Sequence, residues 1–305
     1  MALYQKYRPN SFDNFIGNTD TIEALRNLLS KKERPHVYLF SGPTGCGKTT
    51  LARIVSQLVG AGPTDITEID TADFRGIDTI RELRKQSQYK PMNGDSRAWI
   101  LDECHKLSND AQNALLKLLE DTPEHVYFFL CTTDPHKLLP TIVGRCSIHE
   151  VKKLGDSEMI GLLRRIAKKE GEKVDIPVLE QIALDSQGHP RNAINTLEKV
   201  LAVEPDKRMQ IAKKTAEEQS QSIALCRALI RGAKWKEVRG ILKGLKEEDP
   251  EGVRRHVLAY ASSVLLGGDN QTAAVVLECF IEPFYNSGFP GLVYACYSVV
   301  KDRKS

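Results

Sequence analysis

Short apolar runs alternate with helical stretches in the first half of the chain. Residues 36–40 (HVYLF), 98–101 (AWIL) and 126–131 (VYFFLC) are strongly apolar, which predicts buried strands. The run after residue 50, LARIVSQLVG, has its apolar positions at helical spacing. Strands of this kind separated by helices predict an α/β domain with a parallel sheet over residues 1–150.

The second half of the chain has helical periodicity. Residues 156–200 repeat apolar positions at i, i+3 and i+4, which predicts a small helical domain over 151–205. The following stretch, to about residue 220, is polar and is expected to be a connecting segment. From Ile223 onward, four or more apolar helices with Gly-Gly and Asn-Ser-Gly breaks predict an all-α bundle within 206–305. These helices are IALCRALI, WKEVRGILKGL, VRRHVLAYASSVLL and TAAVVLECFIEPF.

The composition limits the class of protein. With 41% hydrophobic and 27% charged residues over 305 positions, two or three globular domains are expected. No apolar run reaches the roughly 20 residues of a membrane helix, and the N-terminus has no apolar signal region. We therefore expect a cytoplasmic protein without a membrane span. The seven cysteines include no C-x-x-C pair, so reduced thiols are expected. The net charge of +3 is small, so nucleic-acid binding would need a local basic cluster.

A glycine-rich loop joins the first predicted strand to the first predicted helix. Its sequence SGPTGCGKTT matches G-x-x-x-x-G-K-[ST] with Gly42, Gly47, Lys48 and Thr49. Glycines let backbone N–H groups surround phosphates, the lysine reaches the β and γ phosphates, and the threonine ligates Mg²⁺. A glycine-rich turn with an unrelated lysine is the alternative, but both flanking elements favour a nucleotide site. The predicted nucleotide-binding residues of the loop are Gly42, Pro43, Thr44, Gly45, Cys46, Gly47, Lys48, Thr49 and Thr50.

Polar side chains end the second and third predicted strands. Asp102 and Glu103 follow AWIL, and we predict that Asp102 holds Mg²⁺ while Glu103 polarises the attacking water. An acidic turn is the alternative, which the P-loop upstream disfavours. Thr132 and Thr133 end the third strand. Ligands of an open parallel sheet lie beyond the carboxyl ends of its strands, so a threonine here would lie near the γ-phosphate; a plain strand-ending pair is the alternative.

The order of these segments resembles the AAA+ ATPases, and within them the clamp-loader subunits of the bacterial tau/gamma and replication factor C type. The resemblance covers about residues 1–200 and rests on KYRP with FDNFIGN, GPTGCGKT, LDECHKLSNDAQNALLKLLEDTP, CTTDPHKLLPTIVGRC and GHPRNAINTLEK. It implies an AAA+ P-loop domain at 1–150, a helical lid at 151–205 and an oligomerising collar at 206–305. Gly144 departs from the family's S-R-C segment, and the chain lacks the zinc insert of bacterial tau/gamma subunits, as in replication factor C or phage loaders.

The resemblance implies an ATPase subunit that uses ATP and Mg²⁺ to load a sliding clamp onto primer-template DNA. Its partners would be further loader subunits, in a pentameric homo- or hetero-oligomer, together with the clamp and the DNA. Its place would be near the nucleoid, or in the host cytoplasm for a phage protein. Thr133 would be the sensor 1 residue and Arg191 the sensor 2 arginine. The resemblance also implies an adenine side formed by Tyr7, Arg8, Pro9 and Ile16.

Other classes share parts of this pattern. DECH echoes the DExH box of helicases, but the roughly 100 residues after the sensor 2 helix contain no second strand and glycine loop. A branch-migration motor or a protein unfoldase is the competing AAA+ class, and those proteins lack the KYRP opening and the collar. A catalytically inactive subunit is a third alternative. The intact set of Lys48, Thr49, Asp102, Glu103 and Arg145 disfavours it.

Basic residues after the P-loop helix are candidates for DNA contact. DFRGIDTIRELRKQ (73–86) predicts an amphipathic helix from Ile77, for which an ordinary surface helix is the alternative. The stretch resembles the family's R-G-I-D-x-x-R segment, which implies contacts with DNA phosphates. Such contacts position a duplex without reading its bases, so binding would be independent of sequence and sensitive to salt. The predicted contacts are Arg75, Arg81, Lys137 and, more weakly, Lys106.

Two further roles are implied by the resemblance. Gln112 matches a glutamine that couples neighbouring ATP sites, and a plain polar helix residue is the alternative. Tyr89, Pro91 and Met92 in YKPMNG would contact the sliding clamp, with local loop packing as the alternative.

Arg145 is isolated among apolar and small residues, since it is the only charge between Lys137 and Glu150. An arginine brought to a transferring phosphate raises hydrolysis rates by about 10³ to 10⁵. Its S-R-C placement implies that Arg145 reaches the nucleotide of a neighbouring subunit, so the active site would be shared in an oligomer. A structural arginine that pairs with Glu150 or caps a helix is the alternative.

We predict that Arg145→Ala retains ATP binding and loses hydrolysis. The guanidinium would act on the transferring phosphate of a neighbouring subunit and would not be needed to bind ATP. Mixing this variant with a Lys48 variant should restore part of the ATP turnover, since one interface then combines an intact arginine with an intact P-loop. Turnover at the wild-type rate by Arg145→Ala alone would contradict the shared site.

Overall fold

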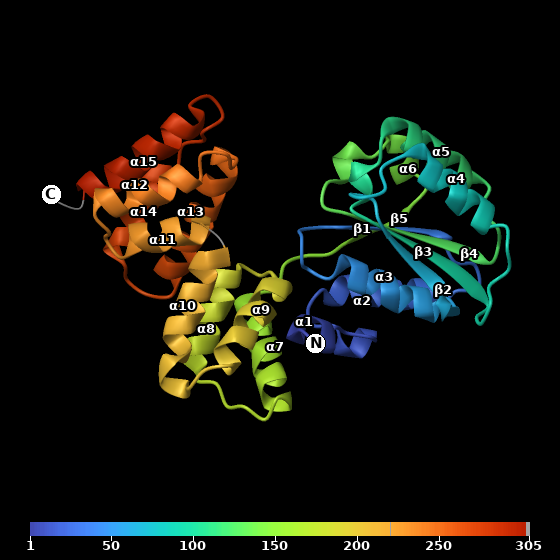
Figure 1. Cartoon of the computed structure of the whole chain (residues 1–305), viewed down its shortest axis with the longest axis horizontal. Coiled ribbons are helices and arrows are strands. Elements are labelled where there is room, and N and C mark those ends of the chain that lie inside the picture. Colours follow the sequence, from blue (N-terminus) through green and yellow to red (C-terminus); the bar gives the residue numbers. More distant parts are fainter. Residues whose placement is uncertain (220, 303–305) are drawn as a thin grey trace. The chain divides into compact units, whose positions relative to one another are not determined.

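The chain divides into two compact units in the computed structural model, which describes residues 1–219 and 221–302 (Figure 1). Unit 1 comprises Met1–Glu158 and Gly188–Arg191, and unit 2 comprises Met159–Gln187 and the chain from Asn192 onward. The predicted domain boundaries at 150 and 205 stay predictions. In the described ranges no helix has the length and apolar character needed to cross a membrane. There, too, no disulfide joins the cysteines.

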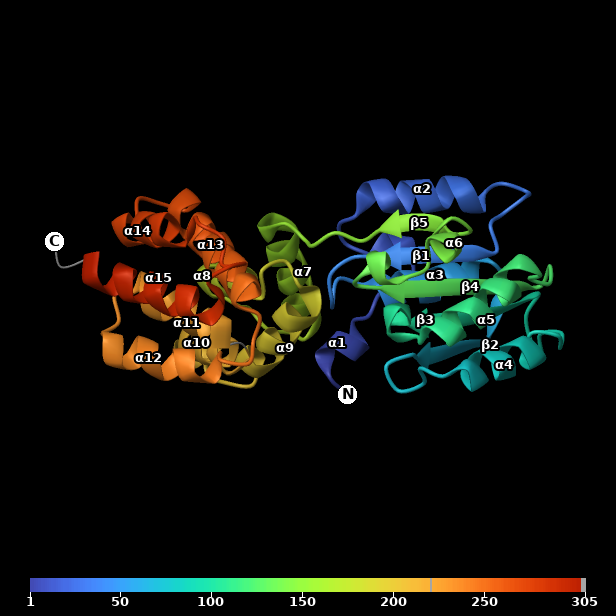
Figure 2. The same cartoon turned by 90° about the horizontal axis from the view of Figure 1, so that it is seen from above.

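Unit 1 is built around a five-stranded sheet in the order β2-β3-β4-β1-β5, and all its strand pairs are parallel (Figure 2). The strands are β1 (Val37–Ser41), β2 (Ala61–Asp70), β3 (Ser96–Asp102), β4 (Val126–Thr132) and β5 (Ser147–Glu150). The three predicted strands correspond to β1, β3 and β4. The predicted α/β fold with a parallel sheet is therefore confirmed.

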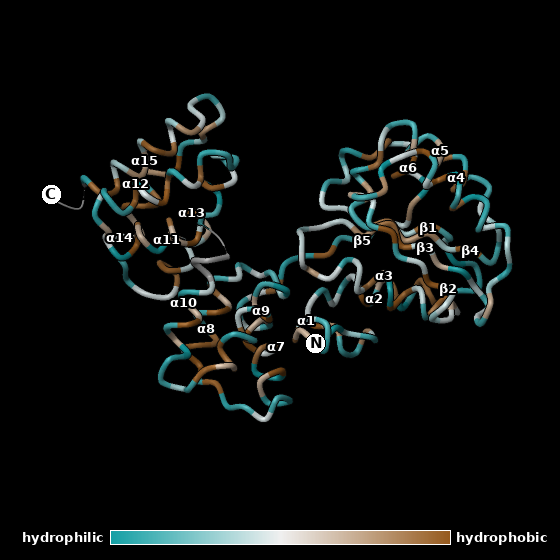
Figure 3. Tube along the Cα trace, viewed as in Figure 1, coloured by the Kyte–Doolittle hydropathy of each residue, from teal (hydrophilic) through white to brown (hydrophobic). Residues whose placement is uncertain are grey.

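The central strands are apolar throughout because both faces of the sheet are covered. Alternate residues of β1 enter different cores: Tyr38 and Phe40 pack with α2 and α3, whereas Val37 and Leu39 pack with α4, α5 and α6. Brown tube along the strands in Figure 3 marks this apolar layer. The helices of unit 1 are α1 (Leu3–Lys6), α2 (Thr19–Leu29), α3 (Lys48–Leu58), α4 (Ile77–Gln86), α5 (Asn109–Glu120) and α6 (Pro140–Val143). The helix predicted from Ile77 is thus confirmed.

The two edge strands, β2 and β5, were not predicted. β2 contains glycine, proline and two aspartates, and most of its residues are exposed or half-buried, so it lacks an apolar run. Its pairing with β3 also shifts in register between Ala61 and Ile66. β5 is only four residues long, with a single buried residue, His149. Edge strands of this kind are held by backbone pairing with a neighbour, which their own sequence does not record.

Unit 2 is entirely helical in its described part. Its helices are α7 (Asp156–Lys169), α8 (Ile176–Ser186), α9 (Pro190–Leu201), α10 (Arg208–Gln219), α11 (Gln221–Ile230), α12 (Trp235–Gly244), α13 (Pro250–Leu266), α14 (Gln271–Phe280) and α15 (Gly288–Asp302). One apolar core joins α11 to α15, which include all four predicted bundle helices. An ion pair between the buried Asp185 of α8 and Arg227 of α11 also ties the predicted lid to the predicted collar.

The prediction of a connecting segment up to residue 220 was wrong, because α10 occupies most of it. The buried residues of this helix include Ala212, Thr215 and Arg208. The face that packs therefore contains few large apolar side chains. Arg208 is satisfied by the carbonyl oxygens of Val203 and Lys173 and by the Glu172 carboxylate. A helix that packs through such residues has no apolar periodicity to recognise.

A buried carboxylate fixes the irregular start of β2. Asp65 accepts hydrogen bonds from the backbone N–H groups of Met92, Asn93 and Gly94 at 2.6, 2.8 and 3.0 Å. Burial alone would raise the pKa of Asp65, but the three donors outweigh it and the pKa is lowered from its ordinary value of 3.8. The ionised side chain therefore ties the loop before β3 to β2.

We predict that Asp65→Asn lowers the free energy of unfolding by about 1–3 kcal/mol at neutral pH, because a charged acceptor of buried donors is lost. Since the folded-state pKa is depressed, this stabilisation is present above 3.8 and is lost as the pH falls from there through the lowered value. Denaturant unfolding across this range measures it, with Asp95→Asn in the same loop as control. A constant difference down to the lowest pH would contradict the assignment.

Candidate nucleotide-binding site

The P-loop has a backbone shape that only glycine adopts easily. Gly42, Gly45 and Gly47 have φ angles of 147°, 74° and 108°, in the left-handed region that other residues rarely enter. A Cβ atom on Gly42 would also lie 2.1 Å from the Val151 carbonyl oxygen. The loop runs from the end of β1 into the first turn of α3, whose N–H groups have no intrahelical partner. This is the cradle that a phosphate requires.

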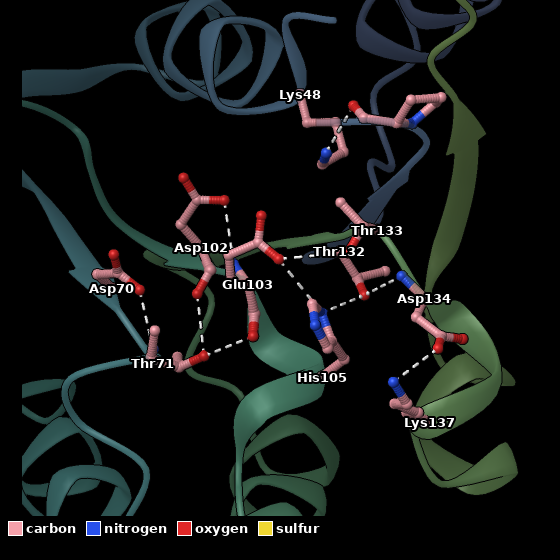
Figure 4. Close-up of polar contacts among 12 residues, drawn as sticks. Lys48, Asp70, Thr71, Asp102, Glu103, His105, Thr132, Thr133, Asp134 and Lys137 are labelled. Carbon is pink, nitrogen blue, oxygen red and sulfur yellow. Dashed lines mark hydrogen bonds and ion pairs between the residues drawn. The ribbon is translucent and has the colours of Figure 1, made fainter. Parts of the chain in front are cut away.

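Lys48 lies at the start of α3 with its side chain folded back over the loop. Its Nζ atom donates to the carbonyl oxygens of Gly42 and Pro43 at 2.9 and 3.0 Å, and the residue is buried (Figure 4). Two neutral carbonyls are modest partners for a buried ammonium group, and charged phosphate oxygens are stronger acceptors. The lysine is therefore placed to transfer to a phosphate bound in the same loop.

A hydroxyl and a carboxylate meet beside this loop. Thr49 Oγ1, in the first turn of α3, donates to Asp102 Oδ2 at the end of β3 over 2.8 Å. Mg²⁺ in nucleotide sites takes one or two protein ligands and completes its shell with phosphates and water. The described residues contain no group of three or more His, Cys, Asp or Glu that could hold a metal ion. A metal site here would therefore have few protein ligands, Thr49 and Asp102.

The predicted catalytic carboxylate lies one residue further. Glu103 has a left-handed backbone with φ 51°, and its Oε2 accepts from Thr133 Oγ1 at 3.4 Å. Thr132, in contrast, is fully buried and its hydroxyl lies 3.1 Å from His105 Nδ1. Figure 4 shows Thr133 beside Glu103, with Thr132 facing the histidine. Thr133 is thus the threonine beside Glu103, and its contact with a γ-phosphate stays a prediction.

Two residues of this cluster were missed by sequence reasoning. Thr71 follows β2 and donates to the carbonyl oxygens of Asp102 and Glu103 at 2.9 and 2.8 Å. Recognition of β2 would have placed it at the carboxyl edge of the sheet. His105, within the DECH segment, lies 3.4 Å from Glu103 Oε2. Its position in that segment was the only available signal.

The N-terminal segment packs against the P-loop. A Cβ atom on Gly47 would lie 2.8 Å from the Phe15 ring. The Asn18 side chain exchanges two hydrogen bonds with the backbone of Lys152. These bonds anchor the loop that follows Phe15. The predicted adenine-side residues Tyr7, Arg8, Pro9 and Ile16 flank Phe15 in sequence and are all half-buried. Their contact with a nucleotide stays a prediction.

Arg191 also lies at this loop, because Gly188–Arg191 belong to unit 1. A Cβ atom on Gly45 would lie 3.3 Å from Arg191 Cβ. His189 Nδ1 lies 2.7 Å from the Thr44 carbonyl oxygen, and burial lowers the pKa of this ring. Since the ring is then neutral and a carbonyl only accepts, its proton lies on Nδ1. The pKa of Arg8 is lowered by burial and then by the charge of Arg53. The charge of Arg191 lowers it further.

Comparison with known proteins identifies the family. The family model described as DNA polymerase III, delta subunit matches residues 63–155. The DNA polymerase III subunit gamma/tau of Mycobacterium tuberculosis (strain H37Rv) is 37% identical over 225 residues, which cover 66% of this chain and 39% of that protein. The subunit tau of Bacillus subtilis (strain 168) is 34% identical over 226 residues, with 67% and 40% covered.

The chain belongs to the AAA+ clamp-loader family. The chain spans about 40% of the length of these curated relatives. Among solved structures, the Thermotoga maritima RuvB Holliday junction branch migration motor superposes with a TM-score of 0.60 and 22% identity, over 88% of each chain. At this identity the likeness shows the fold alone.

Gln112 links two segments of this clamp-loader family member. The side chain is buried on α5 and donates to the carbonyl oxygens of Leu107 and Lys137 at 3.3 and 3.2 Å. Its Oε1 accepts from the Leu139 N–H at 2.9 Å. The glutamine therefore connects the loop after Glu103 to the segment that leads to Arg145. Both the coupling between ATP sites and the alternative of a plain polar helix residue stay predictions.

Arg145 lies just after α6. Its ion-pair partner is Glu120, whereas the sequence alternative was Glu150. Its guanidinium contacts the Glu120 carboxylate at the end of α5 and donates to the Thr141 carbonyl oxygen at 2.9 Å. Both partners of the ion pair remain substantially exposed, with 39% and 43% of their side-chain surfaces accessible. A pair exposed to this degree contributes about 1 kcal/mol or less, so the arginine is easily released.

The predicted DNA contacts gather where three segments meet. The Ser108 N–H donates to the Arg75 carbonyl oxygen at 3.1 Å, which joins the turn before α4 to the start of α5. Gln112 brings the segment of Lys137 to the same place. Arg75, Lys106 and Lys137 are exposed there, and Arg81 on α4 is exposed and paired with Asp78. Their contact with DNA stays a prediction, as does clamp contact by the exposed Tyr89 and Met92 and by Pro91.

We predict that Gln112→Leu lowers the free energy of unfolding by about 2–4 kcal/mol, because three buried or partly buried backbone groups lose their partner. ATP turnover should fall as well, since the segment before Arg145 loses its anchor. Asn113→Leu, an amide-to-leucine change at the next, exposed position of the same helix, is the matched control. Equal stability of the two variants in denaturant unfolding would rule out the anchoring role.

Proposed function

We propose that the protein is an ATPase subunit of a sliding-clamp loader. The observation that carries this proposal is the joint arrangement of Lys48, Thr49–Asp102 and Glu103–Thr133 at one edge of the sheet. That arrangement occurs in a chain 37% identical to a DNA polymerase III subunit gamma/tau. The arrangement supports phosphoryl transfer from ATP, and the relative supports the setting in DNA replication.

The residues of the P-loop have separate tasks in this reaction. When bound, ATP supplies the transferred phosphoryl group and Mg²⁺ neutralises part of its charge. Lys48 exchanges its two carbonyl partners for phosphate oxygens. Thr49 and Asp102 would hold the metal ion. The glycines keep the backbone N–H groups of the loop turned toward the phosphates.

The residues at the ends of β3 and β4 act on the attacking water and the γ-phosphate. Glu103 orients the water and accepts its proton. Thr133 donates its hydroxyl hydrogen to a γ-phosphate oxygen, which requires it to leave Glu103. Arg191 provides positive charge from the start of α9. Arg145 acts on a neighbouring subunit's nucleotide after it leaves Glu120.

In the proposed cycle, ATP binding assembles subunits that open a ring clamp and grip primer-template DNA, and hydrolysis releases both. The grip comes from exposed basic side chains that contact phosphates, so it is independent of base sequence. A branch-migration motor is the alternative, supported by the RuvB fold likeness. At 22% identity that likeness shows the fold alone, so the clamp loader is the preferred proposal.

We predict that primer-template DNA and a sliding clamp together raise the ATP turnover of the full chain, assembled with its partner subunits, at least several-fold over either alone. A coupled phosphate-release assay measures this, with Lys48→Ala as the inactive control because nucleotide binding depends on this lysine. Stimulation by four-way junction DNA without any effect of the clamp would favour a branch-migration motor instead.

A further inference from the structure

Aromatic side chains gather on one exposed face of unit 2. Tyr294 and Tyr297 on α15 are 73% and 47% exposed, and residues three apart are neighbours on a helix surface. Tyr297 meets the half-buried Trp235 at the start of α12, edge to face, with ring centroids 5.2 Å apart. Figure 1 and Figure 2 both show α12 beside α15. The three rings therefore form one aromatic surface across two helices.

A row of basic side chains runs along α12. Lys236, Arg239 and Lys243 are spaced three and four residues apart, so they share one face of the helix. All three are exposed, and at 1.5 Å per residue the row is about 10 Å long. The buried Val238 and Leu242 occupy another face, which packs into the core of unit 2. The row is thus turned to solvent along its whole length.

The basic row borders the aromatic surface. Arg239 follows Trp235 by four residues on α12, and the exposed Lys301 follows Tyr297 by four residues on α15. Residues four apart on a helix are surface neighbours. Each helix therefore places a cation one turn away from a ring, and rings and cations form one continuous face.

The acidic side chain of α12 does not neutralise this row. Glu237 is the one carboxylate within Trp235–Gly244, and it pairs with Arg231, which lies before the helix. Among the described residues, no salt bridge engages Lys236, Arg239 or Lys243. The positive charge of the row is therefore available to an anionic ligand.

A combination of exposed rings and cations fits a single-stranded nucleic acid. Unpaired bases stack on aromatic side chains while lysine and arginine contact the phosphates of the same strand. A duplex keeps its base faces inside the stack, so it would engage the cations alone. An acidic peptide would also meet the cations, but its carboxylates give the tyrosine rings nothing to stack on. Only a single strand uses both parts of the face.

We propose that this face of α12 and α15 binds single-stranded nucleic acid. Tyr294 and Tyr297 stack on bases, and Lys236, Arg239 and Lys243 contact phosphates. Binding is tolerant of sequence, because every base has a flat face, and it is sensitive to salt. The site lies in unit 2, whereas the predicted duplex contacts lie in unit 1. It goes beyond the proposed ATPase function and requires no ATP.

The fluorescence of Trp235 reports on this face. The chain has two tryptophans, and the other, Trp99, is 2% exposed. Its indole N–H has no hydrogen-bond partner among the described residues, so Trp99→Phe should retain the fold and leave Trp235 as the single emitter. Short oligothymidylate or oligouridylate, added to this full chain without ATP, should quench the emission to saturation, and the ratio of the two affinities identifies the preferred sugar.

Two results of this titration overturn the proposal. One is an unchanged Trp235 emission with both strands. The other is equal quenching by a blunt DNA duplex or by a polyglutamate peptide, because either ligand would then be held by charge alone.

Substitutions at Tyr294 separate stacking from folding. Tyr294→Ala should raise the Kd for the strand about fivefold or more, whereas Tyr294→Phe keeps the ring and should bind as the native chain does. Tyr285→Ala is the matched control, because Tyr285 is 69% exposed and lies outside α12 and α15. Fluorescence anisotropy of a labelled strand measures these values without the Trp99→Phe change. An equal Kd for Tyr294→Ala and Tyr285→Ala overturns the proposal.

Removal of the basic row should change the salt dependence. With Lys236→Gln, Arg239→Gln and Lys243→Gln combined, the slope of log K against log salt should become shallower by about two, since each phosphate contact on a single strand contributes about 0.7. Lys207→Gln, at an exposed lysine outside these helices, should leave the slope unchanged. An unchanged slope in the triple variant contradicts the proposal. So does a Tyr294→Ala variant that binds the strand normally and fails to assemble with partner subunits in light scattering, because the face would then be a subunit contact.

Discussion

The parallel register of the sheet is the constraint on which the site depends. Ser41 pairs with Thr132, and Asp70 pairs with Asp102, so the strand ends finish level with one another. Each strand end then delivers one polar group to the same edge. The hydrogen bond between Thr49 and Asp102 joins this edge to the first turn of α3. Strand β4 lies between β1 and β3 and pairs with both. A shift of one residue in either pairing would turn the polar side chains at the strand ends to the opposite face of the sheet.

The buried polar residues of the site are connected to one another through backbone groups. Thr71 donates to the backbone carbonyl oxygens of Asp102 and Glu103, and Gln112 binds the segment that leads to Arg145. Such bonds are modest individually, but unmaking them leaves buried groups without partners. The predicted catalytic side chains are thus held by these supporting bonds. Glu103 is the least firmly held, because its contacts with Thr133 and His105 both measure 3.4 Å.

Local signals made much of unit 1 predictable. The P-loop needs only adjacent residues, and Asp102, Glu103 and Thr133 follow apolar runs whose burial on both faces is visible in the sequence. β2 and α10 were missed because their stability comes from neighbours: β2 from pairing with β3, α10 from polar contacts such as those of Arg208. The contacts of His105 with Thr132 and of Arg145 with Glu120 join distant positions, so spacing along the chain does not reveal them.

The pairing of Arg145 with Glu120 bears on how a subunit behaves outside an assembly. A guanidinium neutralised on its own surface presents no unpaired cation for nonspecific association with nucleic acid. Because the pair is exposed, exchanging the acid for a phosphate requires little free energy. Under the proposed role of Arg145, a free subunit would keep the guanidinium paired with Glu120 and release it on contact with a neighbour. The acid on α5 would serve as a temporary stand-in for the neighbour's nucleotide.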